Sequence, residues 1–180
     1  MEAPTHDILT RKPEPCDGLA IHQLVANSPP LDLNSIYSYY LLSDHFSDTC
    51  IVAECQGKVI GFVSAYLIPQ RPETLFIWQV VVDSELRGRS VARRMISALL
   101  LRLDGLGLGA IEATVNPSNA ASRGLFERLA QQWGSTLETS TFLDASAFGP
   151  AGGHESEILL RIPFHSVMTN NYQEHIDANF

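Results

Sequence analysis

A basic, glycine-containing turn between an apolar run and a helix carries the clearest chemical signal in the sequence. Residues 76–82 form the apolar run, and a helix is predicted to begin near Arg89. The first N–H groups of a helix have no intrahelical acceptor and carry partial positive charge, so they can hold a pyrophosphate. The side chains of Arg87, Arg89, Arg93 and Arg94 add charge-assisted donors. The turn is therefore predicted to be an anion cradle.

Two common nucleotide motifs that use this geometry, Gly-x-Gly-x-x-Gly and Gly-x-x-x-x-Gly-Lys-Ser/Thr, are absent from the turn. The turn resembles the Arg/Gln-x-x-Gly-x-Gly/Ala signature of the GCN5-related N-acetyltransferases (GNAT), with Arg87 first and Ala92 last. In that family the loop holds the coenzyme A pyrophosphate through main-chain amides. Ser90 replaces the middle glycine, which is acceptable if its φ is negative. The alternative interpretation is an ordinary buried strand, a turn and an amphipathic helix with a solvated basic face.

A second motif follows an apolar strand predicted at residues 110–115. Residues 116–129 combine an Asn/Pro turn, a serine cap and a helix, and resemble the second GNAT motif, in which Asn119 and the following helix line the coenzyme. Phe126 departs from the tyrosine that many members carry there, whose hydroxyl can protonate the leaving thiolate. The resemblance implies acetyl-CoA as co-substrate, held by Val80, Val81, Val82, Arg87, Gly88, Arg89, Ser90, Val91, Ala92, Arg93, Asn119, Ser122 and Phe126.

The elements that must position these residues follow an α+β order. Strands are predicted near residues 7–12, 50–54, 59–68, 75–82, 110–115, 135–142 and 157–163, helices at 17–27, 34–44 and 89–103, and turns at 56–58 and 69–73. This irregular alternation predicts helices packed on a mixed, mostly antiparallel sheet. It matches the GNAT fold, which implies that the strand carrying residues 80–82 splays from its neighbour near residues 113–115 and frees amides to act as an oxyanion hole.

Composition favours a compact enzyme for a small substrate. With 180 residues and 45% hydrophobic content, residues 1–165 are predicted to form a single GNAT domain, followed by a polar tail at 166–180. The net charge of −8 disfavours nucleic acid and suits a cationic substrate. The charged fraction of 18% argues against adaptation to a salt-filled cytosol.

Cysteine usage and hydropathy predict a cytoplasmic protein without a metal. The three cysteines, Cys16, Cys50 and Cys55, show no metal-ligand spacing and are predicted to be free thiols in a reducing compartment. Residues 1–12 lack an apolar core of signal-peptide length, and no run approaches a membrane span. No membrane partner is expected.

Three further segments, residues 29–40, 75–80 and 153–157, converge on the acceptor site in the GNAT fold. Their Leu-Asp-x-Asn-Ser/Thr-x-Tyr, Trp-Gln-Val and His-Glu-x-Glu patterns together resemble the branch of the family that acetylates the γ-amine of L-2,4-diaminobutyrate in ectoine synthesis. The resemblance implies the product N4-acetyl-L-2,4-diaminobutyrate, a role in making a compatible solute for osmotic stress, and a homodimer. The apolar region at 142–148 and the late strands are candidates for its interface.

The chemistry of diaminobutyrate suits these segments. Its two amines need anionic or aromatic walls, which Asp32, Glu155, Glu157 and the cation–π face of Trp78 can supply. Its carboxylate needs donors such as Ser35, the helix N-terminus beginning near Asn34, and the Tyr37 hydroxyl, while His154 orients an acid or contacts the ligand. The predicted substrate-binding residues are therefore Asp32, Asn34, Ser35, Tyr37, Trp78, His154, Glu155 and Glu157.

Plain structural roles compete with several of these assignments. Asp32 and Asn34 are also good helix N-caps, and Trp78 also suits core packing. Glu157, at the start of an apolar strand, needs a partner if it points inward. Tyr37 is assigned by its place in the motif, whereas Tyr39 and Tyr40 are expected in the core or an interface.

The predicted reaction is direct attack of a neutral amine on the thioester, so a base must first remove a proton from the ammonium group. Glu157 is the candidate base, with Glu155 or His154 as substitutes, and Tyr37 is a candidate proton donor to the thiolate. No cysteine is placed by motif for a covalent intermediate. Two other functions stay open: acetylation of another small amine such as a polyamine or amino acid, and a non-catalytic coenzyme A-binding regulatory domain, which the Ser90 and Phe126 departures would suit.

Overall fold

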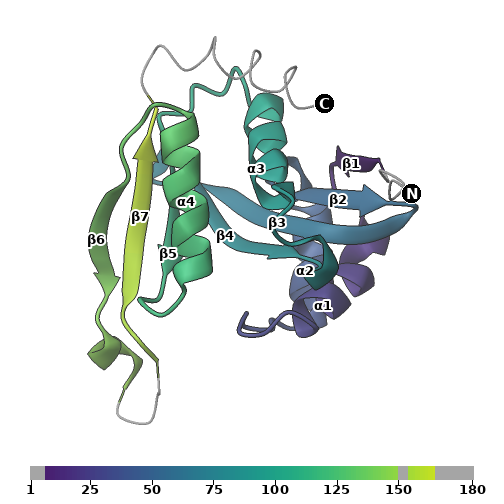
Figure 1. Cartoon of the computed structure of the whole chain (residues 1–180), viewed down its shortest axis with the longest axis horizontal. Helices are drawn as coiled ribbons and strands as arrows, with labels where there is room; N and C mark the ends of the chain where they lie inside the picture. Colours follow the sequence, from purple (N-terminus) through teal and green to yellow (C-terminus); the bar gives the residue numbers. More distant parts are fainter. Residues whose placement is uncertain (1–6, 150–153, 165–180) are drawn as a thin grey trace. The chain divides into compact units, whose positions relative to one another are not determined.

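The structure is a computed structural model that describes residues 7–149 and 154–164. Seven strands in these residues form one mixed sheet in the order β1-β2-β3-β4-β5-β7-β6 (Figure 1). In chain order the elements are β1 (Ile8–Arg11), α1 (Gly18–Ala26), α2 (Ile36–Asp44), β2 (Ile51–Cys55), β3 (Lys58–Ile68), β4 (Arg71–Val82), α3 (Val91–Arg102), β5 (Ala110–Val115), α4 (Ala120–Gln132), β6 (Glu138–Leu143) and β7 (Glu157–Pro163). The described pairs are antiparallel except β4 with β5, so the predicted α+β fold with a mostly antiparallel sheet is confirmed.

The chain divides into two compact units. The first comprises residues up to Tyr66 together with Ile77–Leu103, and the second comprises Leu67–Phe76 and the residues from Asp104 onward. Strands β3 and β4 each run from one unit into the other. The predicted single domain over residues 1–165 stays a prediction, and the predicted tail at 166–180 lies outside the described residues.

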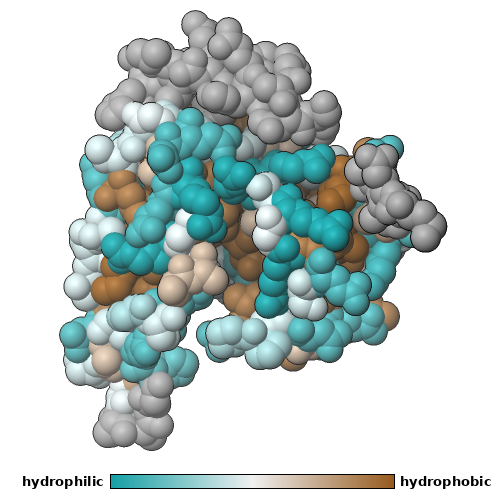
Figure 2. All heavy atoms as spheres, viewed as in Figure 1, coloured by the Kyte–Doolittle hydropathy of each residue, from teal (hydrophilic) through white to brown (hydrophobic). Residues whose placement is uncertain are grey.

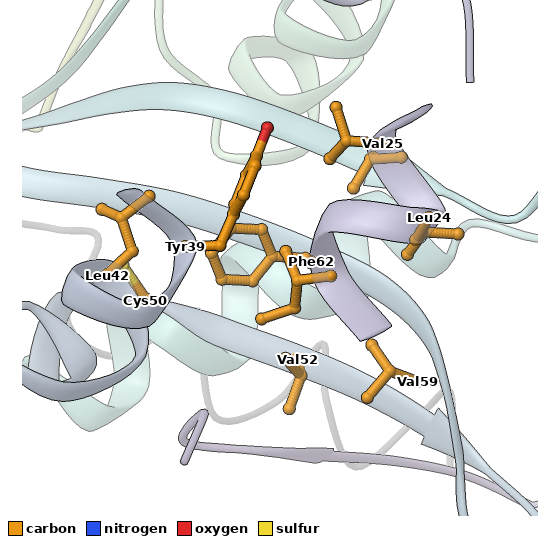
Figure 3. Close-up of a cluster of buried hydrophobic side chains, with 10 residues drawn as sticks. Leu24, Val25, Tyr39, Leu42, Cys50, Val52, Val59 and Phe62 are labelled. Atoms are coloured by element: carbon orange, nitrogen blue, oxygen red, sulfur yellow. The ribbon is translucent and has the colours of Figure 1, made fainter. Parts of the chain in front are cut away.

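The core of the first unit lies where α1 and α2 pack on one face of its strands. Helix α1 contributes the buried Ile21, and α2 contributes Leu42, which pack with Phe62 of β3 and Val81 of β4 in one cluster (Figure 3). Alternation along a strand sends neighbouring side chains to opposite faces. Gly61 therefore faces α3, where an added Cβ would lie 2.9 Å from the Cε atom of Met95.

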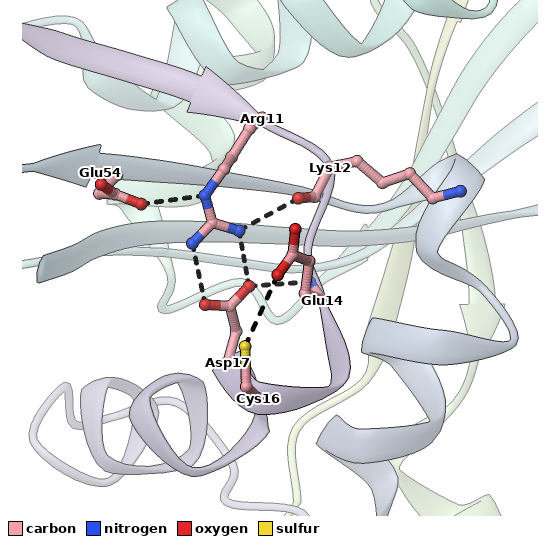
Figure 4. Close-up of polar contacts among 6 residues, drawn as sticks. All are labelled: Arg11, Lys12, Glu14, Cys16, Asp17 and Glu54. Atoms are coloured by element: carbon pink, nitrogen blue, oxygen red, sulfur yellow. Dashed lines mark hydrogen bonds and ion pairs between the residues drawn. The ribbon is translucent and has the colours of Figure 1, made fainter. Parts of the chain in front are cut away.

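An ion-pair network fastens the N-terminal strand of the first unit. Arg11 donates to both carboxylate oxygens of Asp17, at 2.7 and 2.9 Å, and through Nε to Glu54 at 2.9 Å (Figure 4). Asp17 also accepts from the backbone N–H of Glu14 at 2.8 Å. Burial opposes the charged form of Asp17, yet the Arg11 guanidinium holds the pKa of that carboxyl below its usual value. The network ties β1 to β2 and to the start of α1.

The second unit centres on β5, which lies between β4 and β7 in the sheet. Glu112 of β5 is 1% exposed and accepts a bidentate pair of hydrogen bonds from Arg71, at 2.6 and 2.8 Å, and a third from Arg161 of β7 at 2.5 Å. These guanidinium groups, Arg71 first, lower the pKa of Glu112. Helix α4 contacts β7, and hydrophilic side chains run along its outward side (Figure 2).

Some predicted element ends were wrong. Residues 69–73 are not all turn, because β4 begins at Arg71, whose side chain reaches Glu112 on the adjacent strand. The strand predicted from residue 135 begins at Glu138, while the strands at 110–115 and 157–163 are confirmed. Helix α2 is capped by Ser35 rather than by Asp32 or Asn34.

Candidate active site

The turn that is predicted to be an anion cradle lies in the first unit, after the end of β4. A short 3-10 turn, Ser84–Leu86, leads through Gly88 and Ser90 into α3. The backbone N–H of Arg94 donates to the Ser90 carbonyl at 3.0 Å, so the N–H groups of Val91 and Ala92 precede the first intrahelical hydrogen bond. They are oriented as helix N-terminal donors that suit a pyrophosphate.

Ser90 occupies the left-handed region, with a φ of 61°. The condition under which the sequence made a serine acceptable here, a negative φ, is therefore not met, because the loop turns into α3 with the same handedness that a glycine would supply. Its hydroxyl accepts a hydrogen bond from Arg93 at 2.6 Å, which ties one cradle arginine to the helix start. Arg87 is exposed and donates through Nε to the Val82 carbonyl at 3.2 Å, and Arg89 is also exposed.

The three valines at the end of β4 differ in how far their side chains are buried. Val81 is 2% exposed and belongs to the core cluster of the first unit, whereas Val80 and Val82 are half-buried. The side chain of Val81 is therefore committed to the core. The use of main-chain amides from residues 80–82 to hold a coenzyme stays a prediction.

The second predicted coenzyme motif lies in the second unit, at the start of α4. Asn119 caps this helix, and its side-chain oxygen accepts from the backbone N–H of Ser122 at 3.0 Å. The cap is thus Asn119 and not the preceding serine that the sequence suggested. Phe126 is 2% exposed, so the residue at the family's tyrosine position is part of the apolar core.

The predicted acceptor segment, residues 29–40, lies in the first unit and includes the start of α2. The Ser35 hydroxyl accepts from the Ser38 N–H at 3.4 Å and lies 3.0 Å from the Ser38 hydroxyl. Asp32 is exposed, Asn34 is half-buried, and Tyr37 is 67% exposed. Exposed carboxylate and phenol groups are thus available on this segment.

Adjacent residues of β4 serve opposite faces of the strand. Gln79 is buried on the same face as Val81, and Trp78 is 48% exposed on the other face. The alternative that Trp78 is plain core packing was wrong, because nearly half of its surface is accessible. Its ring is available for a cation–π contact.

The predicted acidic loop lies in the second unit, before β7. Glu155 is exposed and accepts from the backbone N–H of Ser118 at 2.9 Å, directly before the α4 cap. His154 stacks on Phe148 with ring centroids 4.9 Å apart. Glu157 is half-buried at the first position of β7. The structure therefore joins this loop to the second coenzyme motif through Glu155.

Comparison with known proteins identifies the family. Residues 19–130 match the family model described as "Acetyltransferase (GNAT) family". The chain belongs to the GNAT acetyltransferase family. The GNAT fold and the resemblance carried by Arg87 and Ala92 are confirmed.

Relatives of this GNAT protein share one name. An L-2,4-diaminobutyric acid acetyltransferase of Bordetella parapertussis is 49% identical over 156 residues, covering 86% of this chain and 83% of the relative. The enzyme of that name from Halomonas elongata is 42% identical over 161 residues, covering 88% and 83%. A diaminobutyrate acetyltransferase from Paenibacillus lautus, whose solved structure is in complex with L-2,4-diaminobutyric acid and coenzyme A, is 39% identical. It has a TM-score of 0.85 and covers 89% of this chain and 98% of that one.

Two buried residues that contact the predicted acceptor segment were not assigned to the site from the sequence. Gln79 donates through Nε2 to the Asp32 carbonyl at 2.9 Å, and Tyr39 donates to Gln79 Oε1 at 3.3 Å. The available signal was a glutamine inside an apolar strand, because a buried amide requires partners. Tyr39 was expected in the core or an interface, and it is 0% exposed.

Neither a metal site nor a membrane-spanning helix is present in the described residues. No group of three or more His, Cys, Asp or Glu side chains in residues 7–149 and 154–164 could hold a metal ion. Among the helices of this same part of the chain, none has the length and hydropathy needed to cross a membrane.

Proposed function

We propose that this protein transfers the acetyl group of acetyl-CoA to the γ-amine of L-2,4-diaminobutyrate. The observation that carries the proposal is the likeness to the Paenibacillus lautus enzyme, whose structure contains this amine and coenzyme A, at 39% identity over most of both chains. The curated relatives of 42–49% identity bear the same activity in their names. The cradle before α3 supports the coenzyme half of the reaction.

The reaction balances as a direct transfer. The γ-ammonium group first loses a proton to a base, and the neutral nitrogen then attacks the thioester carbonyl carbon. The nitrogen of the tetrahedral intermediate gives up a second proton, and the intermediate collapses as the carbon–sulfur bond breaks, which gives the neutral amide and the coenzyme A thiolate. The thiolate takes up one proton, so the overall reaction releases one proton. Main-chain amides near residues 80–82 are proposed to stabilise the oxyanion.

The acceptor residues are proposed from residue chemistry. Asp32 and the face of Trp78 would attract the cationic amines. Ser35 and Tyr37 would donate to the carboxylate, because both carry hydroxyl groups on the segment that enters α2. Asn34 and His154 would complete the set.

Glu157 is proposed as the base. The carboxylate of Glu155 already accepts from the Ser118 N–H, which commits one of its oxygens to the backbone, whereas Glu157 stands half-buried at the start of β7. Partial burial suits a group that must exchange protons with an amine. Glu155 and His154 are the substitutes, and Tyr37 is proposed to protonate the thiolate.

The test is turnover by the purified protein with acetyl-CoA and L-2,4-diaminobutyrate, beside ornithine, lysine, putrescine and spermidine. Product mass and the acetylated nitrogen are determined for each. We expect a clear preference for diaminobutyrate with acetyl on the γ-nitrogen. Preference for another amine would retain the acetyltransferase and refute the substrate. Coenzyme binding without turnover on any amine would favour the regulatory alternative.

Three wider proposals concern the location of the protein, its assembly and its pathway. We propose a cytoplasmic location, supported by three free thiols, of which Cys16 is exposed. We also propose a homodimer, supported by apolar exposure on β6, where Phe142 is 55% and Leu143 is 38% exposed. The pathway role in ectoine synthesis under osmotic stress rests on the substrate.

A further inference from the structure

Two buried polar side chains beneath the acceptor segment take no part in the proposed chemistry. Tyr39 of α2 is 0% exposed and Gln79 of β4 is 9% exposed. Both belong to the first unit. Buried polar groups are tolerated when they are hydrogen-bonded, so the partners of these two side chains show what they hold.

The two side chains form a continuous chain of hydrogen bonds that ends on the acceptor segment at both ends. Gln79 Nε2 donates to the backbone carbonyl of Asp32 at 2.9 Å. Gln79 Oε1 accepts from the Tyr39 hydroxyl at 3.3 Å, and the Tyr39 oxygen accepts from the backbone N–H of Asn34 at 3.3 Å. We call Tyr39 and Gln79 the relay. The relay holds the Asp32 carbonyl and the Asn34 N–H, on the two sides of Leu33.

The position of the Tyr39 hydroxyl is fixed by packing. The Tyr39 ring packs in a T-shaped arrangement against His22, with ring centroids 5.8 Å apart, and against Phe62, with ring centroids 6.5 Å apart. The interplanar angle is 71° in both pairs. The hydroxyl points away from Val52 and Val59 (Figure 3). Because the ring is packed on two sides, its hydroxyl oxygen is held in one place. The relay therefore ties the backbone of residues 32–34 to the rigid core of the first unit.

We infer that Tyr39 and Gln79 are positioning residues that set the affinity for the amine by fixing the backbone of residues 32–34. This inference rests on the proposed function, in which Asp32, Asn34 and Ser35 contact the acceptor. Both relay contacts are to backbone atoms, which leaves the Asp32 carboxylate available to the ligand. The relay acts on the amine and not on the coenzyme cradle.

The test compares Tyr39→Phe and Gln79→Met with Val52→Ala, a control in the same core cluster that carries no relay hydrogen bond. Steady-state kinetics give KM for diaminobutyrate and for acetyl-CoA separately. We expect KM for the amine to rise about tenfold in each relay variant, since an unpaired buried polar group carries a penalty of that order. KM for acetyl-CoA and kcat should stay within about twofold, and Val52→Ala should change neither KM.

Hydrogen–deuterium exchange supplies a readout that does not depend on the substrate. The Asn34 amide should exchange faster in Tyr39→Phe than in the wild type or in Val52→Ala, with exchange in α1 unchanged. The wild type could prefer another amine while the Asn34 amide still exchanges faster in Tyr39→Phe. The substrate proposal would then fail and the relay inference would stand, and KM would be measured with that other amine. Unchanged amine KM and unchanged Asn34 exchange in both relay variants would overturn the inference.

Discussion

Ser90 gives a sharp test of the cradle, because its backbone and its side chain affect stability in opposite directions. Its φ of 61° places an L-residue in the left-handed region, which is disfavoured by about 1–2 kcal/mol. Its hydroxyl accepts from Arg93 at 2.6 Å, a charge-assisted bond that stabilises by about 1 kcal/mol after allowance for half-exposure. Two substitutions separate these effects.

Ser90→Ala keeps the strained backbone and removes the acceptor, so we expect the free energy of unfolding to fall by about 1 kcal/mol. Ser90→Gly also removes the acceptor but relieves the strain. The glycine loses about 0.4–1 kcal/mol to greater freedom of the unfolded chain. The glycine variant should therefore be more stable than the alanine variant by about 0.5–1 kcal/mol.

The assay is urea unfolding of both variants at neutral pH, with coenzyme A affinity measured by calorimetry. Both variants release Arg93 from residue 90, so both should bind coenzyme A more weakly than the wild type. Ser84→Ala is the matched control, because Ser84 is an exposed serine of the same turn. An alanine variant at least as stable as the glycine variant would refute the strain argument.

Three more predictions concern buried and reactive groups. Glu112→Gln should lower the free energy of unfolding by about 2–3 kcal/mol at neutral pH, because it leaves two guanidinium groups without their shared carboxylate. Because the pKa of Glu112 is lowered in the folded protein, this stabilisation is complete above the ordinary pKa of 4.5 and is lost as pH falls through the folded-state pKa. When urea unfolding is repeated at decreasing pH, the free energies of unfolding of the wild type and Glu112→Gln should therefore converge. In thiol labelling of the native protein at pH 8, Cys16 should react quickly and Cys50 slowly, because Cys50 is 0% exposed and burial raises its pKa to about 11; equal rates would contradict the structure. Glu157→Gln should reduce kcat by about 100-fold or more if Glu157 is the base, whereas Glu155→Gln should have a smaller effect, since an amide oxygen can still accept from the Ser118 N–H; the reverse order in a kcat comparison would exchange their roles.

Much of the fold could be predicted because local patterns agree with the final structure. The apolar strand ending at the Arg87 turn, the amphipathic α3 and the strand beginning at Glu157 carry their signals within a few residues. The start of β4 was missed because Arg71, Pro72 and Glu73 have turn-like composition. The contact of Arg71 with Glu112, 41 residues away, and the hydrogen bond from the Gly109 N–H to the Glu73 carbonyl join this segment to distant residues, and neither is visible locally.

The candidate site divides in the same way. The family motifs located the cradle and the acceptor segment, but the positive φ of Ser90 depends on how the loop closes onto α3. The role of Gln79 arises only once α2 brings Tyr39 onto the sheet, 40 residues away in sequence. Short-range patterns thus reveal the residues that meet a ligand more readily than those that hold them in place.

Helix α3 is held at points along its length by side chains of its own. Arg94 in its first turns donates to the Ile8 carbonyl of β1 at 3.3 Å, and Arg102 at its end donates to the carbonyls of Asp48 and Cys50 before β2. In mechanical terms, these hydrogen bonds anchor the helix to neighbouring backbone near both of its ends, so the helix resists sliding along its axis when an anion binds at its N-terminus. The coenzyme end of the site is thereby stiff. Divergence in the choice of amine can then accumulate in loops such as residues 31–35 without disturbing the grip on the coenzyme.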